Sequence, residues 1–206
     1  MRFLLPIGGV VDHRYGILTS PAHTGTPAGI VVGMDWAADN DSFKRGFAPD
    51  VFFPWLDGLM PYRDTCLFVT VPDALGDADK TLNLYREWYQ HFTGWSLAFV
   101  AQDGLERLPA VDFDVLFIGG TTEYKLSNTV AHLIQDARKS GKRIHIGRVN
   151  WHKRYNHFAL MEGSEEFTCD GTRTRFDGAQ RTIRAWTGYM AQRPLHRVIP
   201  DGDSRG

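Results

Sequence analysis

Aspartates that follow short apolar stretches are the main source of possible chemistry in this sequence. The clearest case is "SEEFTCDGTRTRF" (164–176), in which an apolar approach ends at Asp170 and is followed by Gly, Thr and two arginines. A turn needs only an Asx residue and a glycine, whereas a reaction centre needs a carboxylate with partners. The aspartates in such positions are Asp39, Asp41, Asp73, Asp103 and Asp170.

Other catalytic and metal-binding patterns are missing. The sequence has no serine elbow, no P-loop and no H-E-x-x-H helix. His152 and His157 are five residues apart and would not share a helix face, and the two cysteines, Cys66 and Cys169, form neither a disulfide framework nor a zinc site. We therefore expect no metal and no cofactor, and a reducing cytoplasm as the default compartment. A metal hydrolase built on the aspartates stays open, although nothing in their spacing specifically requires a metal.

Seven short apolar runs alternate with amphipathic stretches of helical length. The runs are continuous, as expected for parallel strands that are covered on both faces. We predict strands at Phe3–Ile7, Ile30–Met34, Cys66–Val71, Leu97–Ala101, Val115–Ile118, Arg143–Ile146 and Glu166–Cys169. We predict helices at Pro49–Leu59, Ala78–Phe92, Tyr124–Ser140, Trp151–Met161 and Ala179–Gln192.

This alternation predicts an α/β fold, and the strand count favours a compact (β/α)8 TIM-type barrel. An open doubly wound sheet is the alternative, but "PIGGVVDHRYG" lacks the G-x-G-x-x-G expected after its first strand. The carboxyl ends of barrel strands meet at one rim, so the polar residues after the predicted strands would share a pocket. Some of these polar residues instead suit helix capping, and Asp77 and Ser127 are predicted N-caps.

The chain of 206 residues is interpreted as one domain, 1–206, with a flexible tail near 194–206. No apolar run is long enough to cross a bilayer, and the N-terminus reads as a first strand and not as a signal peptide. Residues 138–184 hold eleven Lys/Arg against five Asp/Glu, a local balance of +6. This basic third could face phosphates or simply form solvated helix faces.

Six loop motifs together resemble the tRNA-guanine transglycosylase superfamily. They are "DNDSF" at 39–43, "VPD" at 71–73, "AQDG" at 101–104, "GGTTE" at 119–123, "IHIGRVN" at 144–150 and "CDGTRTR" at 169–175. The match is closest to the short phage-type relatives that place 7-deazaguanine bases into DNA. The resemblance implies a (β/α)8 barrel that exchanges guanine through a covalent aspartyl–sugar intermediate, with Asp170 as the nucleophile and Asp39 as the general acid/base.

The same resemblance implies a base-binding site. Asp73 would accept from the purine N1–H and amine, Gln102 would bind the base edge, and the backbone of Gly119 and Gly120 would approach the base closely. Phe43 could stack on the ring. The sequence departs from the family pattern at Asn40, Asp41, Ser42 and Asp103, and its "GGTTE" loop is two residues shorter.

The family's zinc module has no counterpart here, because only Cys169 lies near the aspartate and it precedes it. Loss of that module favours DNA over tRNA as the polymer, with a free 7-deazaguanine base as the second substrate and no membrane partner. tRNA stays the alternative, and the sequence predicts no particular oligomeric state. If the chain is phage-encoded, the compartment would be the host cytoplasm. The predicted phosphate contacts are Arg148, Lys153, Arg154, Arg173 and Arg175.

Two other functions remain open at this point. A barrel hydrolase of glycosides or nucleosides would use Asp39 and Asp170 as its carboxylate pair. A non-catalytic nucleic-acid-binding protein would keep the barrel without its chemistry. The polar rim speaks against the second, because binding an anionic polymer does not require carboxylates.

Overall fold

The computed structural model describes residues 1–6, 11–42, 46–172, 181 and 184, and within them eight parallel strands form a closed barrel. The strands pair in chain order, and β8 closes the barrel by pairing with β1. This topology confirms the predicted TIM-type barrel and excludes the open sheet. The strands are β1 (Arg2–Pro6), β2 (Gly16–Thr19), β3 (Trp36–Ala38), β4 (Cys66–Thr70), β5 (Leu97–Ala101), β6 (Val115–Ile118), β7 (Arg143–Ile146) and β8 (Thr168–Asp170).

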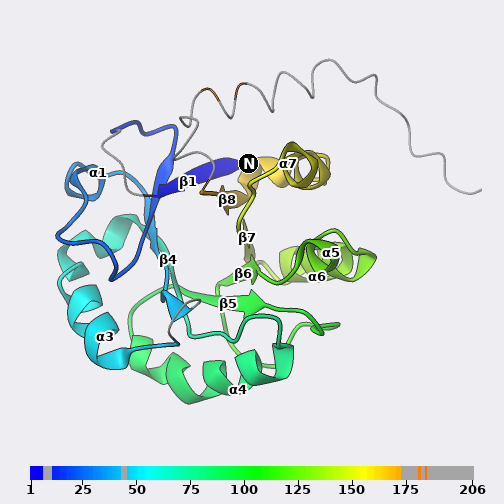
Figure 1. Cartoon of the computed structure of the whole chain (residues 1–206), viewed down its shortest axis with the longest axis horizontal. Helices are drawn as coiled ribbons and strands as arrows, with labels where there is room; N and C mark the ends of the chain where they lie inside the picture. Colours follow the sequence, from blue (N-terminus) through cyan, green and yellow to red (C-terminus); the bar gives the residue numbers. More distant parts are fainter. Residues whose placement is uncertain (7–10, 43–45, 173–180, 182–183, 185–206) are drawn as a thin grey trace, which may run out of the picture.

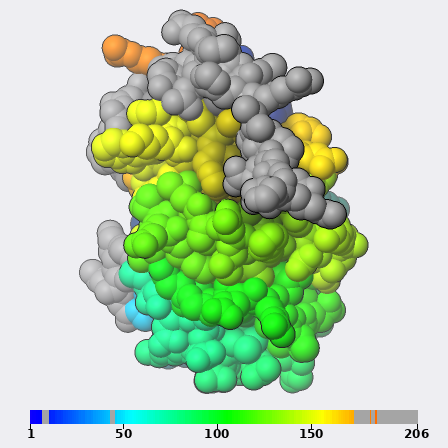
Figure 2. All heavy atoms as spheres, turned by 90° about the vertical axis from the view of Figure 1, so that its right-hand side faces the viewer, coloured from blue at the N-terminus to red at the C-terminus, as the bar shows by residue number. Residues whose placement is uncertain are grey.

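Helices surround the strands in chain order (Figure 1). They are α1 (Ala28–Val31), α3 (Pro49–Asp57), α4 (Ala78–Trp88), α5 (Thr122–Lys125), α6 (Asn128–Lys139) and α7 (His152–Ala159), with 3-10 turns η1 (Met60–Thr65), η2 (Tyr89–Phe92) and η3 (Ser164–Glu166). Figure 2 shows one side of this outer layer, on which the chain runs from α4 at the bottom, through α5 and α6, to α7 above. Asp77 and Ser127 cap α4 and α6 as predicted, each accepting a backbone N–H through its side chain.

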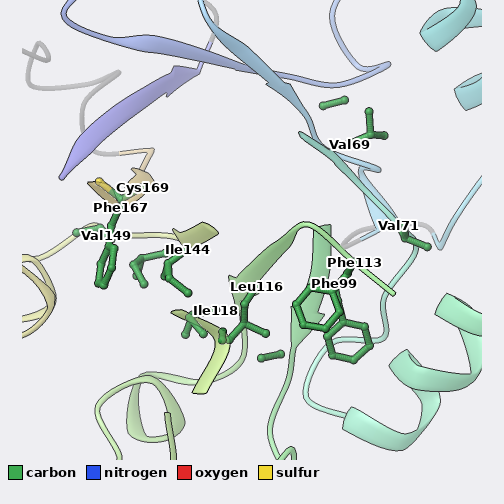
Figure 3. Packing of buried hydrophobic residues seen from close by; sticks show 14 of the residues in the cluster. Val69, Val71, Phe99, Phe113, Leu116, Ile118, Ile144, Val149, Phe167 and Cys169 are labelled. Carbon is green, nitrogen blue, oxygen red and sulfur yellow. The ribbon is translucent and has the colours of Figure 1, made fainter. Parts of the chain in front are cut away.

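Alternation along each strand divides the apolar side chains into two sets. The larger set lies between strands and helices; Figure 3 shows part of it, including Phe99, Leu116 and Ile144. The smaller set fills the barrel interior and consists of Leu4, Ala37, Phe68, Ala98 and Val115. Residues two positions further along these strands also face inward, so the alternation alone aims Asp39, Thr70, Val100 and Phe117 at the upper end of the barrel interior.

The predicted strand Ile30–Met34 is wrong. Its first residues lie in α1, and Gly33 follows with φ 85°, so the segment is a helix and a turn. Ile30 and Met34 are buried, but Val31 and Val32 are exposed. A short apolar run does not distinguish a half-buried helix from a strand. The two strands that precede and follow this segment in the chain, β2 and β3, were not predicted.

Other boundaries also differ from the prediction. The predicted helix Tyr124–Ser140 is two helices, because Ser127 starts α6 afresh. The predicted strand Glu166–Cys169 is shifted, since Glu166 still belongs to η3 and β8 ends on Asp170. The predicted helix Ala179–Gln192, apart from positions 181 and 184, and the tail at 194–206 lie outside the described residues. None of the described helices has the length and apolar character that a membrane span needs.

Candidate active site

A cavity of about 90 Å³ opens at the carboxyl ends of β3 to β8. This volume is several times the roughly 10–15 Å³ that one water molecule requires, so the cavity has room for part of a small molecule. It contains seven of the residues predicted for the site: Asp39, Asp73, Gln102, Gly119, Gly120, Arg148 and Asp170. The fold therefore brings together residues from the loops whose sequence motifs predicted a shared site.

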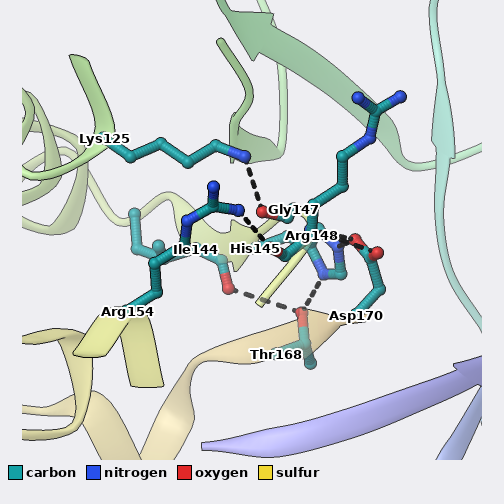
Figure 4. A network of polar contacts seen from close by, with 8 residues as sticks. All are labelled: Lys125, Ile144, His145, Gly147, Arg148, Arg154, Thr168 and Asp170. Atoms are coloured by element: carbon teal, nitrogen blue, oxygen red, sulfur yellow. Dashed lines mark hydrogen bonds and ion pairs between the residues drawn. The ribbon is translucent and has the colours of Figure 1, made fainter. Parts of the chain in front are cut away.

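Asp170 is the last residue of β8 and is 8% exposed. The backbone N–H of Arg148 donates to both of its carboxylate oxygens, at 3.1 and 3.2 Å (Figure 4). Arg148 has φ 56°, a left-handed conformation that is uncommon for a residue with a side chain. The strained backbone of this loop is thus associated directly with the orientation of the Asp170 carboxylate.

His145 supports Asp170 from inside the barrel. Its ring is fully buried, lies 4.9 Å from the Phe68 ring and 4.4 Å from the Phe117 ring, and places Nε2 3.1 Å from Asp170 Oδ2. Nδ1 lies 2.9 Å from the hydroxyl of Thr168. The sequence analysis missed His145, although a histidine between two isoleucines in a buried strand is a signal that it needs an internal partner.

Asp39 follows β3 directly, and its backbone N–H donates to the Thr19 carbonyl at 2.7 Å. Burial, together with a smaller effect of the negative charges of Asp170 and Asp73, raises the pKa of its carboxyl to about 6. A backbone hydrogen bond from Asp41 opposes the shift. Asp39, Asp73 and Asp170 all line the same cavity.

Asp73 is held by two amides. Asn40 donates to one carboxylate oxygen at 3.1 Å, and Gln102 donates to the other at 2.6 Å. The Gln102 carbonyl in turn accepts from the backbone N–H of Gly76 at 3.0 Å, which fixes the amide orientation. Burial raises the pKa of Asp73, while these hydrogen bonds and the Arg148 guanidinium oppose the rise. Asn40 was noted in the sequence only as a departure, yet it is part of this network.

Gly119 and Gly120 line the cavity, but packing explains why both positions lack a side chain. A Cβ on Gly119 would lie 2.7 Å from Val100 Cγ1, and one on Gly120 would lie 2.5 Å from Asp103 Oδ2. Asp103 itself accepts from the backbone N–H of Thr121 at 2.8 Å and therefore anchors the start of α5. Asp103 is thus part of the loop framework and does not line the cavity.

Lys125 is a cavity residue that the sequence analysis did not find. It is 2% exposed, and its Nζ donates to the Gly147 carbonyl at 2.7 Å. Burial lowers the pKa of its ammonium to about 8, and the Asp170 charge opposes this shift. A lysine at the end of "TEYK" resembles an ordinary solvated helix residue, so the sequence holds no signal for its burial.

The predicted phosphate-binding residues divide into three groups. Arg148 lines the cavity; Arg154 donates to the Arg148 carbonyl at 2.6 Å and also to Thr122, so it holds α7 against α5. Lys153 lies exposed on α7, next to Trp151, which is 58% exposed. Arg173 and Arg175, and with them the predicted stacking residue Phe43, lie outside the described residues.

Two further observations bear on ligands. Within the described part of the chain, no three His, Cys, Asp or Glu side chains are grouped so that they could hold a metal ion. The Thr70 hydroxyl, which lines the cavity and is 2% exposed, has no hydrogen-bond partner among the described residues. A buried polar group without a partner favours a site that a polar ligand or water completes.

Comparisons of the chain with protein-family models, with curated proteins and with solved structures give no match. The likeness of the loops to the transglycosylase superfamily therefore stays a prediction from the sequence.

Proposed function

We propose that this protein is a base-exchange transglycosylase that replaces guanine in DNA with a 7-deazaguanine base through a covalent aspartyl–sugar intermediate. One observation carries the proposal. Asp170 ends β8, Asp39 directly follows β3, and both line one cavity with Asp73, whose own oxygens are held by an amide network. A nucleophile, an acid/base and a recognition group for purine N–H donors are thus available in one place.

In the first half of the exchange, a carboxylate oxygen of Asp170 bonds to C1′ as the C1′–N9 bond breaks. The electron pair of that bond leaves with the guanine. The backbone N–H of Arg148 and the ring of His145 hold the carboxylate in one orientation, in which it would face the sugar. Covalent capture splits one difficult displacement into two easier ones.

In the second half, the N9 of the incoming base attacks C1′ and releases Asp170. Asp39 accepts the N9 proton of the incoming base, having assisted the departure of guanine when protonated. Its pKa of about 6 lies close to neutrality, where a group exchanges protons most effectively. The two carboxylates therefore take different roles because their surroundings differ.

Asp73 and Gln102 would read the base. The remaining lone pairs of Asp73 suit the N1–H and exocyclic amine that guanine and 7-deazaguanine share. A guanine in duplex DNA reaches the cavity only when flipped out, and its phosphates would then lie near Arg148, Lys153 and Arg154. Phe43, Arg173 and Arg175 keep their predicted roles in stacking and phosphate binding, and tRNA is the alternative polymer.

Asp170→Asn tests the proposal. DNA and tRNA would be incubated separately with the protein and candidate 7-deazaguanine bases, and their nucleosides analysed by mass spectrometry. We expect the native protein to incorporate the base into DNA and to form a covalent protein–DNA adduct, and the variant to lose both while retaining its fold. Undiminished exchange by the variant would eliminate Asp170 as the nucleophile, and incorporation into tRNA alone would change the polymer.

A hydrolase of nucleosides or glycosides is the second candidate, and the raised pKa of Asp39 supports it. Glycoside hydrolysis also uses a pair of carboxyl groups, of which the general acid has a raised pKa. Labelled base separates the two reactions: a hydrolase releases guanine without incorporating label, whereas an exchange enzyme incorporates it.

A further inference from the structure

Lys125 is a buried cation in the cavity that the reaction above does not use. Its side chain extends from α5 across the end of β7 to the Gly147 carbonyl (Figure 4). Lysine is almost never fully buried in proteins unless it is paired, because its ammonium loses hydration. A hydrogen bond to one carbonyl would be served as well by a neutral donor. The position of a full positive charge at this point therefore calls for a different explanation.

The backbone that carries Lys125 is firmly anchored. Thr121 caps α5 and is itself bound to Asp103, and the Tyr124 hydroxyl donates to the Leu105 carbonyl at 2.9 Å. Arg154 from α7 contacts Thr122 on the same helix. The ammonium is consequently presented at a fixed place, as preorganised electrostatic stabilisation requires.

The charges around Lys125 come from several elements. Asp170 on β8 and Asp103 after β5 attract it, whereas Arg148 after β7 and Arg154 on α7 repel it. Asp170 would be neutralised on forming an ester with the sugar. At that moment Lys125 loses the strongest of the attractive charges that act on it, and a new negative charge in the cavity would replace it.

We propose that Lys125 binds the departing purine and stabilises the negative charge that develops on it as the C1′–N9 bond breaks. This inference rests on the transglycosylase function proposed above. The electron pair of the broken bond spreads over the purine ring, and the Lys125 ammonium pairs with the resulting anion. No bond to Lys125 is formed, and the ammonium keeps its proton.

Proton availability supports this division of roles. With a pKa of about 6, only about one Asp39 carboxyl in ten is protonated at pH 7. The Lys125 ammonium, with a pKa of about 8, is protonated in about nine molecules in ten at that pH. A cation is thus present at nearly every turnover, whereas the Asp39 proton is not.

The test is a change of leaving group. Lys125→Met removes the cation and keeps the length of the side chain. We expect it to slow the exchange of ordinary guanine about 100-fold, the usual effect of removing one group that stabilises a developing anion. DNA carrying 7-methylguanine releases a neutral base, so its release by the variant should stay close to that of the native protein. Lys139→Met, which removes an exposed positive charge on α6, is the matched control and should exchange normally.

Lys125→Arg gives a second readout, because it keeps a cation that does not titrate near neutrality. The native protein should lose exchange activity above about pH 8, where Lys125 deprotonates, and this loss should move to higher pH in Lys125→Arg. Equal slowing of guanine and 7-methylguanine release by Lys125→Met would overturn the inference, because it would indicate a structural role. Borohydride trapping of a sugar on Lys125 would overturn it too, by making the lysine a nucleophile. If the native protein shows no exchange at all, the proposed function itself fails, and that outcome is distinct from both.

Discussion

His145 and Thr168 form a chain of polar contacts behind the Asp170 carboxylate. Nε2 of His145 lies 3.1 Å from Asp170 Oδ2, and Nδ1 lies 2.9 Å from the Thr168 hydroxyl, so both ring nitrogens have a polar partner. The Thr168 hydroxyl in turn donates to the Ile144 carbonyl at 3.4 Å. The Phe68 and Phe117 rings pack against the His145 ring and against each other, which restricts its orientation. His145 is thus a positioning residue, since it acts on the sugar only through Asp170.

His145→Phe should keep the packing against the Phe68 and Phe117 rings while removing the contact to Asp170. We expect kcat for base exchange to fall about 10- to 100-fold, because a small displacement of a nucleophile is costly, while KM changes little. Steady-state kinetics on DNA separate these constants. His145→Gln keeps an amide that can donate to Asp170, and it should recover part of the lost rate.

A rise in KM with kcat unchanged would contradict this role and point to a contact with the substrate. A variant that is simply less stable would lose activity in parallel with its folded fraction, which circular dichroism reports. The expected result is a folded protein with a low kcat.

At the scale of elements, the sequence predicted four of the strands closely. Cys66–Thr70, Leu97–Ala101, Val115–Ile118 and Arg143–Ile146 were all expected within a residue. The three-residue strand Trp36–Ala38 is too short to produce a pattern, and it is recognisable only by the barrel that surrounds it. Short strands in a closed barrel are fixed by their neighbours and not by their own propensity.

The site, like the strands, could be predicted in part from the sequence. Asp39 and Gln102 directly follow strands, Asp170 ends one and Asp73 lies in the loop after one, and the topology then brings them together. Lys125 is different, because it lies beyond a strand in a short helix, and only the fold shows that its side chain turns back into the cavity. Direct continuation of a strand is visible in a sequence, whereas a side chain returning from a helix is not.

The turn after β6 offers a test of the packing role assigned to Gly120. Gly120 has φ 77°, and an added Cβ would meet Asp103 and the Tyr124 ring. Gly120→Ala should lower the free energy of unfolding by about 2–4 kcal/mol, from the left-handed backbone plus the overlap. Gly76→Ala is the matched control, since Gly76 has φ 72° with nothing within 4 Å of its Cβ position, and it should cost only about 1–2 kcal/mol. Urea unfolding of both variants measures the difference, and equal costs would contradict the packing role.

The start of α7 offers a test of polymer binding. Lys153 is exposed there beside Trp151, and no acidic residue lies in the first turn of the helix. Lys153→Ala should weaken DNA binding to the same degree on all sequences and should reduce the slope of log K against log salt by about 1. Lys139→Ala serves as the control. An unchanged slope in Lys153→Ala would mean that α7 faces solvent in the complex.

For the whole molecule, the charged groups of the cavity lower the free energy of unfolding, although the proposed reaction needs them. Three carboxylates surround one small space, and burial raises the pKa of both Asp39 and Asp73. A raised carboxyl pKa means that the folded state disfavours the ionised form. At neutral pH the native protein therefore keeps a charge that it would be more stable without.

Asp39→Asn should consequently stabilise the fold at pH 7 while impairing exchange. The folded carboxyl has a pKa of about 6 against the ordinary 3.8, so between these values the folded state binds more protons than the unfolded state. The contribution of Asp39 is favourable below about pH 4 and is lost as the pH rises through 6. An asparagine keeps the oxygen that accepts from the Asp41 N–H and carries no charge. The variant should thus gain about 2–3 kcal/mol over the native protein at pH 7 and almost nothing at pH 4. Urea unfolding of both proteins at the two pH values measures this difference, and a gain that is the same at both would show that the stabilisation does not come from the Asp39 charge.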